Sequence, residues 1–407
     1  MSQIIIQGTS VLLSGETSFI HHTIGTETCK LVHLSKTPTP IETEGKDQDK
    51  STATSDTTSK EKALDKDVKI NFVCSALSSD NTLLAIQSPQ KMLLVYEVQS
   101  WKVIYEKQLG RGASKIIFTP DDKAIVVGDK TGDVFLYDIY SDKKETLLLG
   151  HLSMVLDIIM RDDSKYIITC DRDEKIRVSN YPNCYNIENY CLGHEQFVTN
   201  VQLLPHNKKL LISCSGDGTV RLWDYLLGNI KDIYKFNNKV ESDTSNIESQ
   251  NQLKCFTSIK LNDTTSIVCV SIFKSHVVHV LLVNHENFEM INKINLDYEP
   301  IHLQLSLYPN TDSNEICLWL VGQNELHAYT WDNTSKSFAA ATNSAVLKSL
   351  NVLSSNLKDL AIDTNTENVI YVLQKRKMDE ITDYYARKKA RLEEKSNKSF
   401  KNKLAIN

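Results

Sequence analysis

The residue types that most often carry chemistry are present in this chain, but not at the spacings that chemistry needs. It has eleven histidines and nine cysteines, with no C-x-x-C pair, no H-E-x-x-H, no P-loop and no G-x-G-x-x-G. Those motifs hold zinc or cradle phosphate groups. Several cysteines stand inside apolar runs such as residues 267–270 (IVCV), which is typical of reduced core residues in a reducing compartment. We therefore expect no catalytic residue, no metal site and no cofactor on this chain.

A second kind of chemistry, recognition through charge, is indicated by residues 170–180. Five consecutive residues there are charged and a sixth charge follows one isoleucine later; after Asp171 they are Arg172, Asp173, Glu174, Lys175 and Arg177. A tight turn needs only one or two polar residues, so this stretch has more charge than its local structure requires. Exposed charge is common and usually contributes little. The stretch is therefore either a solvated turn or a surface that binds a partner.

These charges fall within a repeat that predicts the fold. Four similar windows begin at residues 88, 128, 170 and 214, so their period of 40 to 44 residues matches one four-stranded blade of a β-propeller. A short apolar run bounded by turn-forming residues precedes each window and indicates a buried strand. We predict an all-β propeller over residues 1–373 with about seven four-stranded blades. Its last two strands, near 357–363 and 368–373, are expected to close the ring with amino-terminal strands between residues 10 and 34.

Dipeptides in two of the repeats resemble those of the WD-repeat propeller family. A Gly-His pair ending at His151 opens the fourth blade, and another ending at His194 opens the fifth. A Trp-Asp pair beginning at Trp223 ends the corresponding window of the fifth blade. The resemblance implies a WD-repeat propeller in which these residues hold each blade together.

In that family a buried hydrogen-bonded set, called the lock below, joins the histidine to an aspartate, a hydroxyl and the tryptophan. Buried polar groups are tolerated when they satisfy one another, so the lock is structural. The fifth-blade lock is implied to consist of His194, Asp217, Ser213 and Trp223. In the fourth blade Asp173 aligns with Asp217, and we expect it to pair with His151; Ser179 replaces the tryptophan.

Two insertions have compositions that do not suit blade strands. Residues 35–66 and 241–252 are rich in Ser, Thr, Asp, Glu and Lys and almost free of bulky apolar side chains. Such segments cannot bury enough apolar surface to offset the entropy of ordering. We predict a disordered loop at each.

The segment 374–407 changes to a basic pattern. It has eleven Lys/Arg and five Asp/Glu, an excess of six positive charges, so the remaining residues sum to −11 within the net charge of −5. Apolar residues three, four and seven apart indicate a helix. Two basic clusters have the spacing of a two-part nuclear import signal and would also neutralise phosphates: Lys375, Arg376, Lys377, Arg387, Lys388, Lys389 and Arg391. The alternative is a solvated basic tail.

Beyond the fold, several segments resemble one particular family. Residues 148–157, 171–177 and 193–198, with the tail segment 379–385 and the basic cluster after it, are similar to the non-catalytic WD-repeat subunit of the eukaryotic tRNA (guanine-N7-)-methyltransferase. The match is specific over about residues 148–224 and weaker in the tail. It implies a heterodimer with a Rossmann-fold catalytic subunit, which binds S-adenosylmethionine and methylates the guanine at tRNA position 46.

The same resemblance implies what this chain contributes. The family's Arg-Asp-Glu-Lys-Ile-Arg/Lys run faces complementary charges on the enzyme, so the implied docking residues are Arg172, Asp173, Glu174, Lys175 and Arg177. Mixed signs along one strand give orientation and specificity more than raw affinity. The tail would extend beside the enzyme towards the tRNA backbone, where phosphate contacts position the RNA. S-adenosylmethionine would belong to the partner alone.

Two other functions remain open. A propeller of this kind could be a substrate adaptor in a ubiquitin-ligase or chromatin complex, using the narrow face around its central channel. A free-standing RNA binder is less favoured, because a propeller of charge −11 would leave phosphate binding to the tail. The chain shows no signal peptide pattern and no run of about 20 apolar residues. We expect a nuclear protein, with the cytoplasm as a second location and no membrane association.

Overall fold

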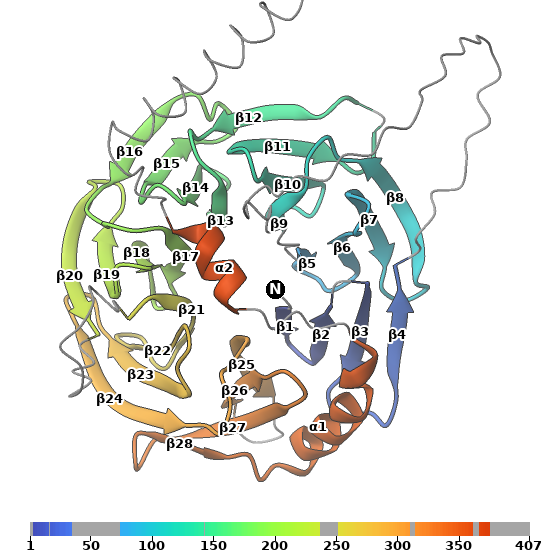
Figure 1. The fold of residues 1–407 in the computed structure, drawn as a ribbon, viewed down its shortest axis with the longest axis vertical. Helices are drawn as coiled ribbons and strands as arrows, with labels where there is room; N and C mark the ends of the chain where they lie inside the picture. The colour runs from blue at the N-terminus through green and yellow to red at the C-terminus, as the bar shows by residue number, and fades with distance from the viewer. Residues whose placement is uncertain are drawn as a thin grey trace, which may run out of the picture. The chain divides into compact units, whose positions relative to one another are not determined.

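The computed structural model describes residues 3–15, 17–34, 74–141, 143–236, 251–309, 314–360 and 366–374. Within them, twenty-eight strands form seven sheets arranged around a central channel (Figure 1). Each sheet consists of four consecutive antiparallel strands in chain order. The predicted all-β propeller of about seven four-stranded blades is confirmed.

The first four blades use sixteen successive strands. Blade 1 contains β1 (Gln3–Gln7), β2 (Ser10–Ser14), β3 (Ser18–Thr23) and β4 (Cys29–His33), and blade 2 contains β5 (Ser75–Leu77), β6 (Leu83–Gln87), β7 (Met92–Glu97) and β8 (Lys102–Gln108). Blade 3 contains β9 (Ala113–Phe118), β10 (Ala124–Asp129), β11 (Asp133–Asp138) and β12 (Thr146–Gly150), and blade 4 contains β13 (Val155–Met160), β14 (Tyr166–Asp171), β15 (Ile176–Asn180) and β16 (Ile187–Cys191).

The last three blades continue in the same way. Blade 5 contains β17 (Val198–Leu204), β18 (Asn207–Ser215), β19 (Thr219–Asp224) and β20 (Asn229–Lys235). Blade 6 contains β21 (Leu253–Lys260), β22 (Ser266–Ile272), β23 (Val277–Val283) and β24 (Phe288–Asn295). Blade 7 contains β25 (His302–Pro309), β26 (Asn314–Val321), β27 (Leu326–Asp332) and β28 (Ser337–Ala340).

The position of a strand within its blade follows from its apolar content. The middle strands are covered on both faces by neighbouring blades, as in β22, where all seven residues are buried. Continuous apolar runs suit strands that are buried on both faces. The outermost strands are mostly exposed, as in β20. Apolar clusters fill the seams between blades, for example Leu222 of blade 5 with Leu281 of blade 6.

The ring closes differently from the prediction. Strands were expected near 357–363 and 368–373, but this prediction is wrong, because the described part of that segment is helical. It contains α1 (Ser344–Asn356), the 3-10 helix η1 (Leu357–Asp359) and α2 (Thr366–Leu373). Blade 1 takes all four of its strands from the amino-terminal segment.

Helix α1 is positioned by its cap and its apolar face. Asn343 caps the helix, since its Oδ1 accepts a hydrogen bond from Ala345 N at 2.9 Å. Val346 and Leu353 are spaced by seven residues and pack in the cluster that joins blade 1 to blade 7. A short apolar run can form a helix or a strand, and here the available partner is the seam between two finished sheets.

Helix α2 lies at one mouth of the central channel (Figure 1). Its Val369 and Leu373 pack with Phe197, which precedes β17, and with Phe273, which follows β22. The turn between β18 and β19 lies at the same end of the propeller, because Gly216 N donates to Phe197 O at 2.8 Å. We call this end of the propeller, with the turns between the second and third strands of the blades, the α2 face.

Several predictions concern residues outside the described ones. The chain divides into a compact unit, Met1–Leu373, and a segment Gln374–Asn407, of which only Gln374 is described. The predicted loop at 35–66, the predicted tail helix and the tail residues named above lie outside, as does the loop at 241–252 apart from Asn251 and Gln252. No helix among the described residues is long and apolar enough to cross a membrane.

Candidate partner-binding edge in blade 4

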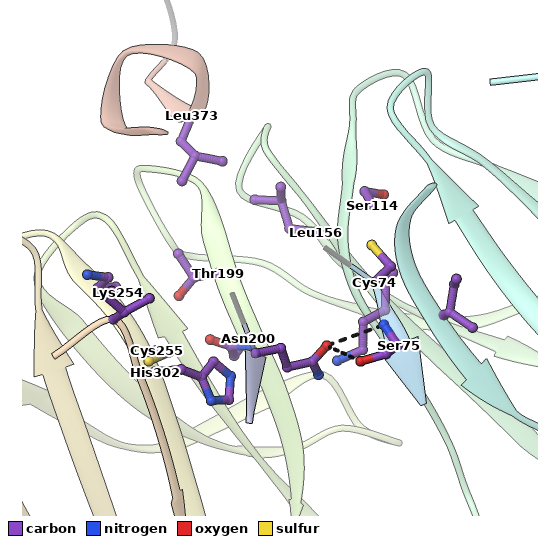
Figure 2. A pocket seen from close by; sticks show the side chains of 14 residues that line it. Cys74, Ser75, Ser114, Leu156, Thr199, Asn200, Lys254, Cys255, His302 and Leu373 are labelled. Carbon is purple, nitrogen blue, oxygen red and sulfur yellow. Dashed lines mark hydrogen bonds between the residues drawn. The ribbon is translucent and has the colours of Figure 1, made fainter. Parts of the chain in front are cut away.

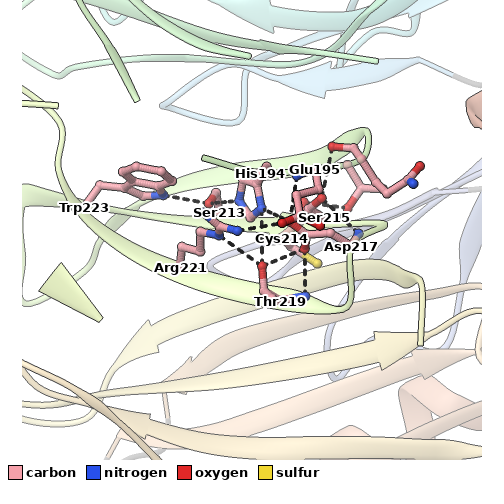
Figure 3. Close-up of polar contacts among 11 residues, drawn as sticks. His194, Glu195, Ser213, Cys214, Ser215, Asp217, Thr219, Arg221 and Trp223 are labelled. Atoms are coloured by element: carbon pink, nitrogen blue, oxygen red, sulfur yellow. Dashed lines mark hydrogen bonds and ion pairs between the residues drawn. The ribbon is translucent and has the colours of Figure 1, made fainter. Parts of the chain in front are cut away.

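The four implied lock residues of blade 5 lie together in its interior (Figure 3). His194 Nδ1 is 2.7 Å from Asp217 Oδ2, and His194 Nε2 is 2.7 Å from Ser213 Oγ. Trp223 donates from Nε1 to the same Ser213 Oγ at 2.8 Å. A Ser-His-Asp set could in principle activate a nucleophile. Here Ser213 is fully buried and its hydroxyl is bonded by both neighbours, so the arrangement stabilises the blade.

Burial controls the protonation of this lock. Burial lowers the pKa of His194 below its ordinary value, although the hydrogen bond that Asp217 accepts from the imidazole acts in the opposite direction. Burial alone would raise the pKa of Asp217, but hydrogen bonds with His194 and Thr219 outweigh it and hold that pKa below its usual range. The lock is thus a neutral imidazole hydrogen-bonded to a carboxylate at neutral pH.

Blade 4 has its own lock, but with a different aspartate from the expected one. His151 Nδ1 lies 3.0 Å from Asp171 Oδ2, and His151 Nε2 lies 2.7 Å from Thr169 Oγ1. The expectation that Asp173 pairs with His151 is therefore wrong. Asp171 is the last residue of β14, and its Oδ1 also accepts from Lys175 N at 2.9 Å, so one buried carboxylate serves both histidine and turn.

The four charged side chains after Asp171 lie on the turn between β14 and β15, at the α2 face; we call Arg172, Asp173, Glu174 and Lys175 the charged turn. All four are half-buried. Lys175 Nζ donates to Asp173 O at 3.3 Å. Glu174 has φ +63°, where the equivalent residue of blade 5 is Gly218 with φ +78°. A side chain at positive φ costs folding energy, so the turn geometry alone would favour glycine at this position.

Arg172 carries the clearest sign of a missing partner. Its backbone N donates to Met154 O at 2.9 Å, which fixes the turn against the preceding loop. Its Nε is buried and has no hydrogen-bond acceptor among the described residues, since Asp173 Oδ1 is 3.9 Å away. An unpaired buried donor on a charged group costs free energy of about 1–3 kcal/mol. The Arg172 side chain as a whole is 37% exposed, so its outer part is accessible to a carboxylate of another protein.

Arg177 differs from the charged turn in both position and burial. Its side chain is buried, and it donates from Nε to Ser179 Oγ (2.8 Å) and from Nη2 to Cys184 O (2.6 Å). Nη1 donates to Gly150 O at 3.2 Å. Ser179, which stands in the place of the lock tryptophan, thus holds the guanidinium. The side chain of Arg177 therefore bonds within blade 4 and to the end of blade 3, and it lies apart from the charged turn.

Leu152 belongs to the same surface, although it is not among the predicted site residues. It lies in the loop between His151 and Met154, and its side chain is 97% exposed. The equivalent residue after the blade 5 histidine is the exposed Glu195. Comparison of the repeats could have identified Leu152, because it is a leucine at a position where blade 5 has a charged residue. A fully exposed leucine beside a charged turn is typical of a protein-binding surface.

A cavity of about 120 Å³ lies in the central channel, with Leu373 of α2 at its edge (Figure 2). Two lysines line it, and each is paired: Lys115 Nζ is 2.8 Å from Asp157 Oδ1, and Lys254 Nζ is 2.8 Å from Glu299 Oε1. Burial lowers the pKa of His302 in this cavity to about 3. The described residues contain no group of three or more His, Cys, Asp or Glu that could hold a metal ion.

Solved structures similar to this chain share its fold. The carboxy-terminal WD40 domain of Sif2 superposes with a TM-score of 0.52 at 15% identity, over 78% of each chain. A chain of the mitotic checkpoint complex superposes with a TM-score of 0.56 at 13% identity, over 78% of this chain and 85% of that one. At these identities the likeness extends to the WD40 propeller alone.

Sequence comparison is more specific. The family model for the tRNA methyltransferase TRM82 WD40 domain matches residues 30–146 and 140–353. A protein of Culex quinquefasciatus, named tRNA (guanine-N(7)-)-methyltransferase non-catalytic subunit wuho, is 30% identical over 81% of this chain and 78% of its own. The protein of the same name from Drosophila mojavensis is 48% identical over 40% of this chain, and the match spans 43% of that relative. This chain belongs to the TRM82 WD40 family, as its resemblance in blades 4 and 5 predicts.

Proposed function

We propose that this chain is the non-catalytic subunit of a tRNA (guanine-N7-)-methyltransferase, which binds and stabilises the catalytic subunit through the charged turn and Leu152. Family membership supports this proposal, because the relatives carry the words non-catalytic subunit in their names. In this assignment the catalytic partner is a Rossmann-fold enzyme that binds S-adenosylmethionine, and the two subunits form a heterodimer. The present chain holds the enzyme in its active arrangement and helps to seat tRNA.

One observation carries the proposal: the lock of blade 4 is complete without the side chains of the charged turn. His151, Asp171 and Thr169 satisfy one another, and the lock uses only the backbone of Lys175. Four charged side chains therefore stand beside a finished lock. These four partly exposed side chains form a surface suited to opposite charges on another protein.

The mixture of signs on the charged turn suits orientation. Arg172 and Lys175 flank Asp173 and Glu174, so a partner must present charges in the reverse order to bind without repulsion. Leu152 adds apolar area that would be buried in the complex. In this arrangement the leucine contributes mainly to affinity, and the charges contribute mainly to specificity and to the rate of encounter.

The basic tail is assigned to tRNA and to nuclear import. Its clusters, Lys375, Arg376 and Lys377 with Arg387, Lys388, Lys389 and Arg391, would neutralise phosphates while the catalytic subunit reads the guanine. Leu373, the last residue of the compact unit, packs in the apolar cluster at the α2 face. We place the complex in the nucleus, with the cytoplasm as a second location.

A substrate adaptor for a ubiquitin-ligase or chromatin complex is the second candidate, and one observation disfavours it. Such an adaptor would use the narrow face around the channel. At the α2 face, α2 lies at one side of this mouth, beside β13 and β17, and its Leu373 lines the channel cavity. The surplus charges lie at the turn of blade 4 instead.

The direct test is purification of the tagged full-length chain from its own cells, followed by mass spectrometry of bound proteins and an assay of tRNA N7-methylation. The proposal predicts a methyltransferase as the main partner, and it predicts that methylation by this enzyme falls at least tenfold when the chain is depleted. A ubiquitin ligase as main partner, with methylation unchanged, would overturn it.

A further inference from the structure

Two buried arginines occupy the same place in successive blades. Arg177 on β15 pairs with Thr169, and Arg221 on β19 pairs with Ser213, so the two share one register position. Each guanidinium lies against the end of the preceding blade. Arg177 donates to Gly150 O, and a Cβ on Gly193 would lie 2.5 Å from Arg221 Nη1. In blades 4 and 5 this seam therefore contains a cation supplied by the chain itself.

Blade 3 has a cavity at the corresponding seam. Phe135 pairs with Val127 at the register position of the two arginines. The space beside it, between blades 2 and 3, is a cavity of about 210 Å³. A water molecule takes up about 30 Å³, so the cavity is large enough for one long side chain. Its polar and aromatic lining is Arg111, Asp129, Asp133, Phe135, Tyr137 and Glu145.

Three of the nine lining residues are acidic, and Arg111 is the one basic residue among them. Asp129 is 5% exposed, and its Oδ1 accepts hydrogen bonds from the turn, including Thr131 N (2.8 Å) and Gly132 N (3.0 Å). Glu145 lies 3.6 Å from Lys107, and the side chain of Arg111 is exposed. Burial and then the nearby Glu145 raise the pKa of Tyr137 to about 12, which is consistent with negative charge in the cavity wall.

The lock of blade 3 lacks the histidine that pairs with the equivalent aspartate, Asp171, in blade 4. Leu109 stands in the place of the lock histidine, because Leu109 N donates to Lys91 O (2.9 Å) as His151 N donates to Gly132 O (2.8 Å). Asp129 thus keeps the turn that Asp171 holds in blade 4, but the histidine is replaced by an apolar side chain. Blade 3 therefore retains the carboxylate of Asp129 but has no histidine N–H to donate to it.

A single loop joins this cavity to the charged turn. The turn between β10 and β11 packs directly on residues 151–154, since a Cβ on Gly132 would clash with the carbonyls of His151 and Ser153. At the other end of the loop, Met154 O accepts from Arg172 N. The exposed Leu152 lies between the two contacts. Residues 151–154 therefore link the turn of blade 3, beside the cavity, to the charged turn of blade 4.

We propose that the cavity of blade 3 receives an arginine side chain of the catalytic subunit, a contact that rests on the proposed function. A guanidinium fits a site with carboxylates and two aromatic walls, because it can hydrogen-bond in its plane and stack on a ring. The chain's own arginines occupy the equivalent seams of the next two blades. A partner docked on the charged turn would span Leu152 and reach this cavity.

The sharpest variant is Phe135→Arg, which supplies the cation from the chain itself. The new side chain would follow the path of Arg177 and Arg221 and fill the cavity. We expect the dissociation constant for the purified catalytic subunit to rise at least tenfold, and the unfolding midpoint is measured alongside because Phe135 packs against the apolar cluster of blades 2 and 3. Leu307→Arg is the matched control, because it adds the same charge at a 42% exposed position of blade 7 and should leave binding unchanged.

A second variant removes the cavity's charge without filling it. Asp133→Asn with Glu145→Gln should weaken binding of the catalytic subunit about five- to tenfold at constant ionic strength. Asp263→Asn with Glu286→Gln changes the charge equally on exposed turns at the opposite end of blade 6 and serves as control.

The proposal is overturned if both cavity variants bind the catalytic subunit as the wild type does. If Phe135→Arg does not fold, the double variant decides alone. A Glu174→Lys variant is measured in parallel: if that change abolishes binding and the cavity variants do not, only the arginine contact fails. If Glu174→Lys also binds normally, the proposed docking through the charged turn and Leu152 is itself wrong.

Discussion

His151 Nδ1 lies 3.0 Å from Asp171 Oδ2, and the side chain of Asp173, two residues later, takes no part in that contact. This relationship divides the charged stretch into a structural half and a recognition half. Asp171 is 1% exposed and completes the lock, whereas Asp173 is half-buried on the turn. Each half can be tested separately.

Replacing the two aspartates should have opposite consequences. Asp171→Asn removes the charge-assisted bond to His151 and weakens the turn, so it should lower the free energy of unfolding by about 1–3 kcal/mol. Asp173→Asn should leave stability within about 0.5 kcal/mol and weaken binding of the catalytic subunit instead. Urea denaturation and calorimetric titration measure the two effects. An equal loss of stability in both variants would contradict the division.

Glu174→Gly isolates the contribution of a single charge. Glycine is the residue of blade 5 at this turn position, and it adopts positive φ without steric cost. We expect the unfolding free energy to stay the same or rise by up to about 1 kcal/mol, because the turn strain is relieved. Binding of the catalytic subunit should fall at the same time. Unchanged binding would show that Glu174 is not part of the interface.

Leu152→Ser tests the apolar part of the proposed docking surface, which consists of the charged turn and Leu152. The side chain is 97% exposed, so the unfolding midpoint should not move. The dissociation constant should rise about tenfold, or about 1.4 kcal/mol, and this loss should be nearly independent of salt. Substitutions in the charged turn should instead lose their effect as salt screens the charges. A strongly salt-dependent loss for Leu152→Ser would contradict this assignment.

The sequence predicts the propeller well because the signals for it are local. The repeat period, the apolar runs and the Gly-His spacing depend only on residues within one blade, and the blades are uninterrupted segments. The helices α1 and α2 were missed because their apolar runs are short, and a short apolar run can form a helix or a strand. The surfaces that these helices pack against are formed by distant parts of the chain. Val346 lies against blades 1 and 7, and Leu373 reaches the channel.

The site was predicted in part for a related reason. The sequence alignment placed Asp173 opposite Asp217. Asp171 and Asp173 both lie next to the same turn, so the sequence does not distinguish them, and only the backbone geometry shows that the carboxylate of Asp171 contacts His151. Arg177 has a counterpart in Arg221, and both side chains are buried, a fact that charge patterning cannot reveal. Leu152 carried a weak signal, since its counterpart is the charged Glu195.

Buried histidines should make the fold sensitive to acid. Burial and then the charge of Lys293 lower the pKa of His279 to about 4, from an unfolded value near 6.5. Above pH 6.5 His279 is neutral in both the folded and the unfolded chain, so its titration does not reduce the stability of the fold. As the pH falls from 6.5 towards 4 the fold loses stability, because His279 binds a proton more tightly in the unfolded chain. This group should lower the unfolding free energy by about 2 kcal/mol between pH 7 and 5. His279→Leu should flatten that pH dependence, as measured by urea denaturation at each pH.

Removal of residues 374–407 tests the tail. The eleven basic residues there should contribute phosphate contacts, so tRNA binding by the complex should weaken mainly at low salt, and the salt dependence of binding should become shallower. Because Leu373 is kept, α2 retains its apolar contacts and the unfolding midpoint should be unchanged. A loss of tRNA binding that is equal at all salt concentrations would indicate a folding or subunit defect instead.

The central claim is tested most directly by the affinity of the Glu174→Lys variant for the purified catalytic subunit, measured together with its unfolding midpoint. Lysine is compatible with this turn, since Lys91 holds the equivalent position of blade 2 at φ +63°. Our account predicts a midpoint within about 2 °C of the wild type, roughly 0.5 kcal/mol, and a rise of at least a hundredfold in the dissociation constant. Wild-type affinity in a folded Glu174→Lys variant would contradict it.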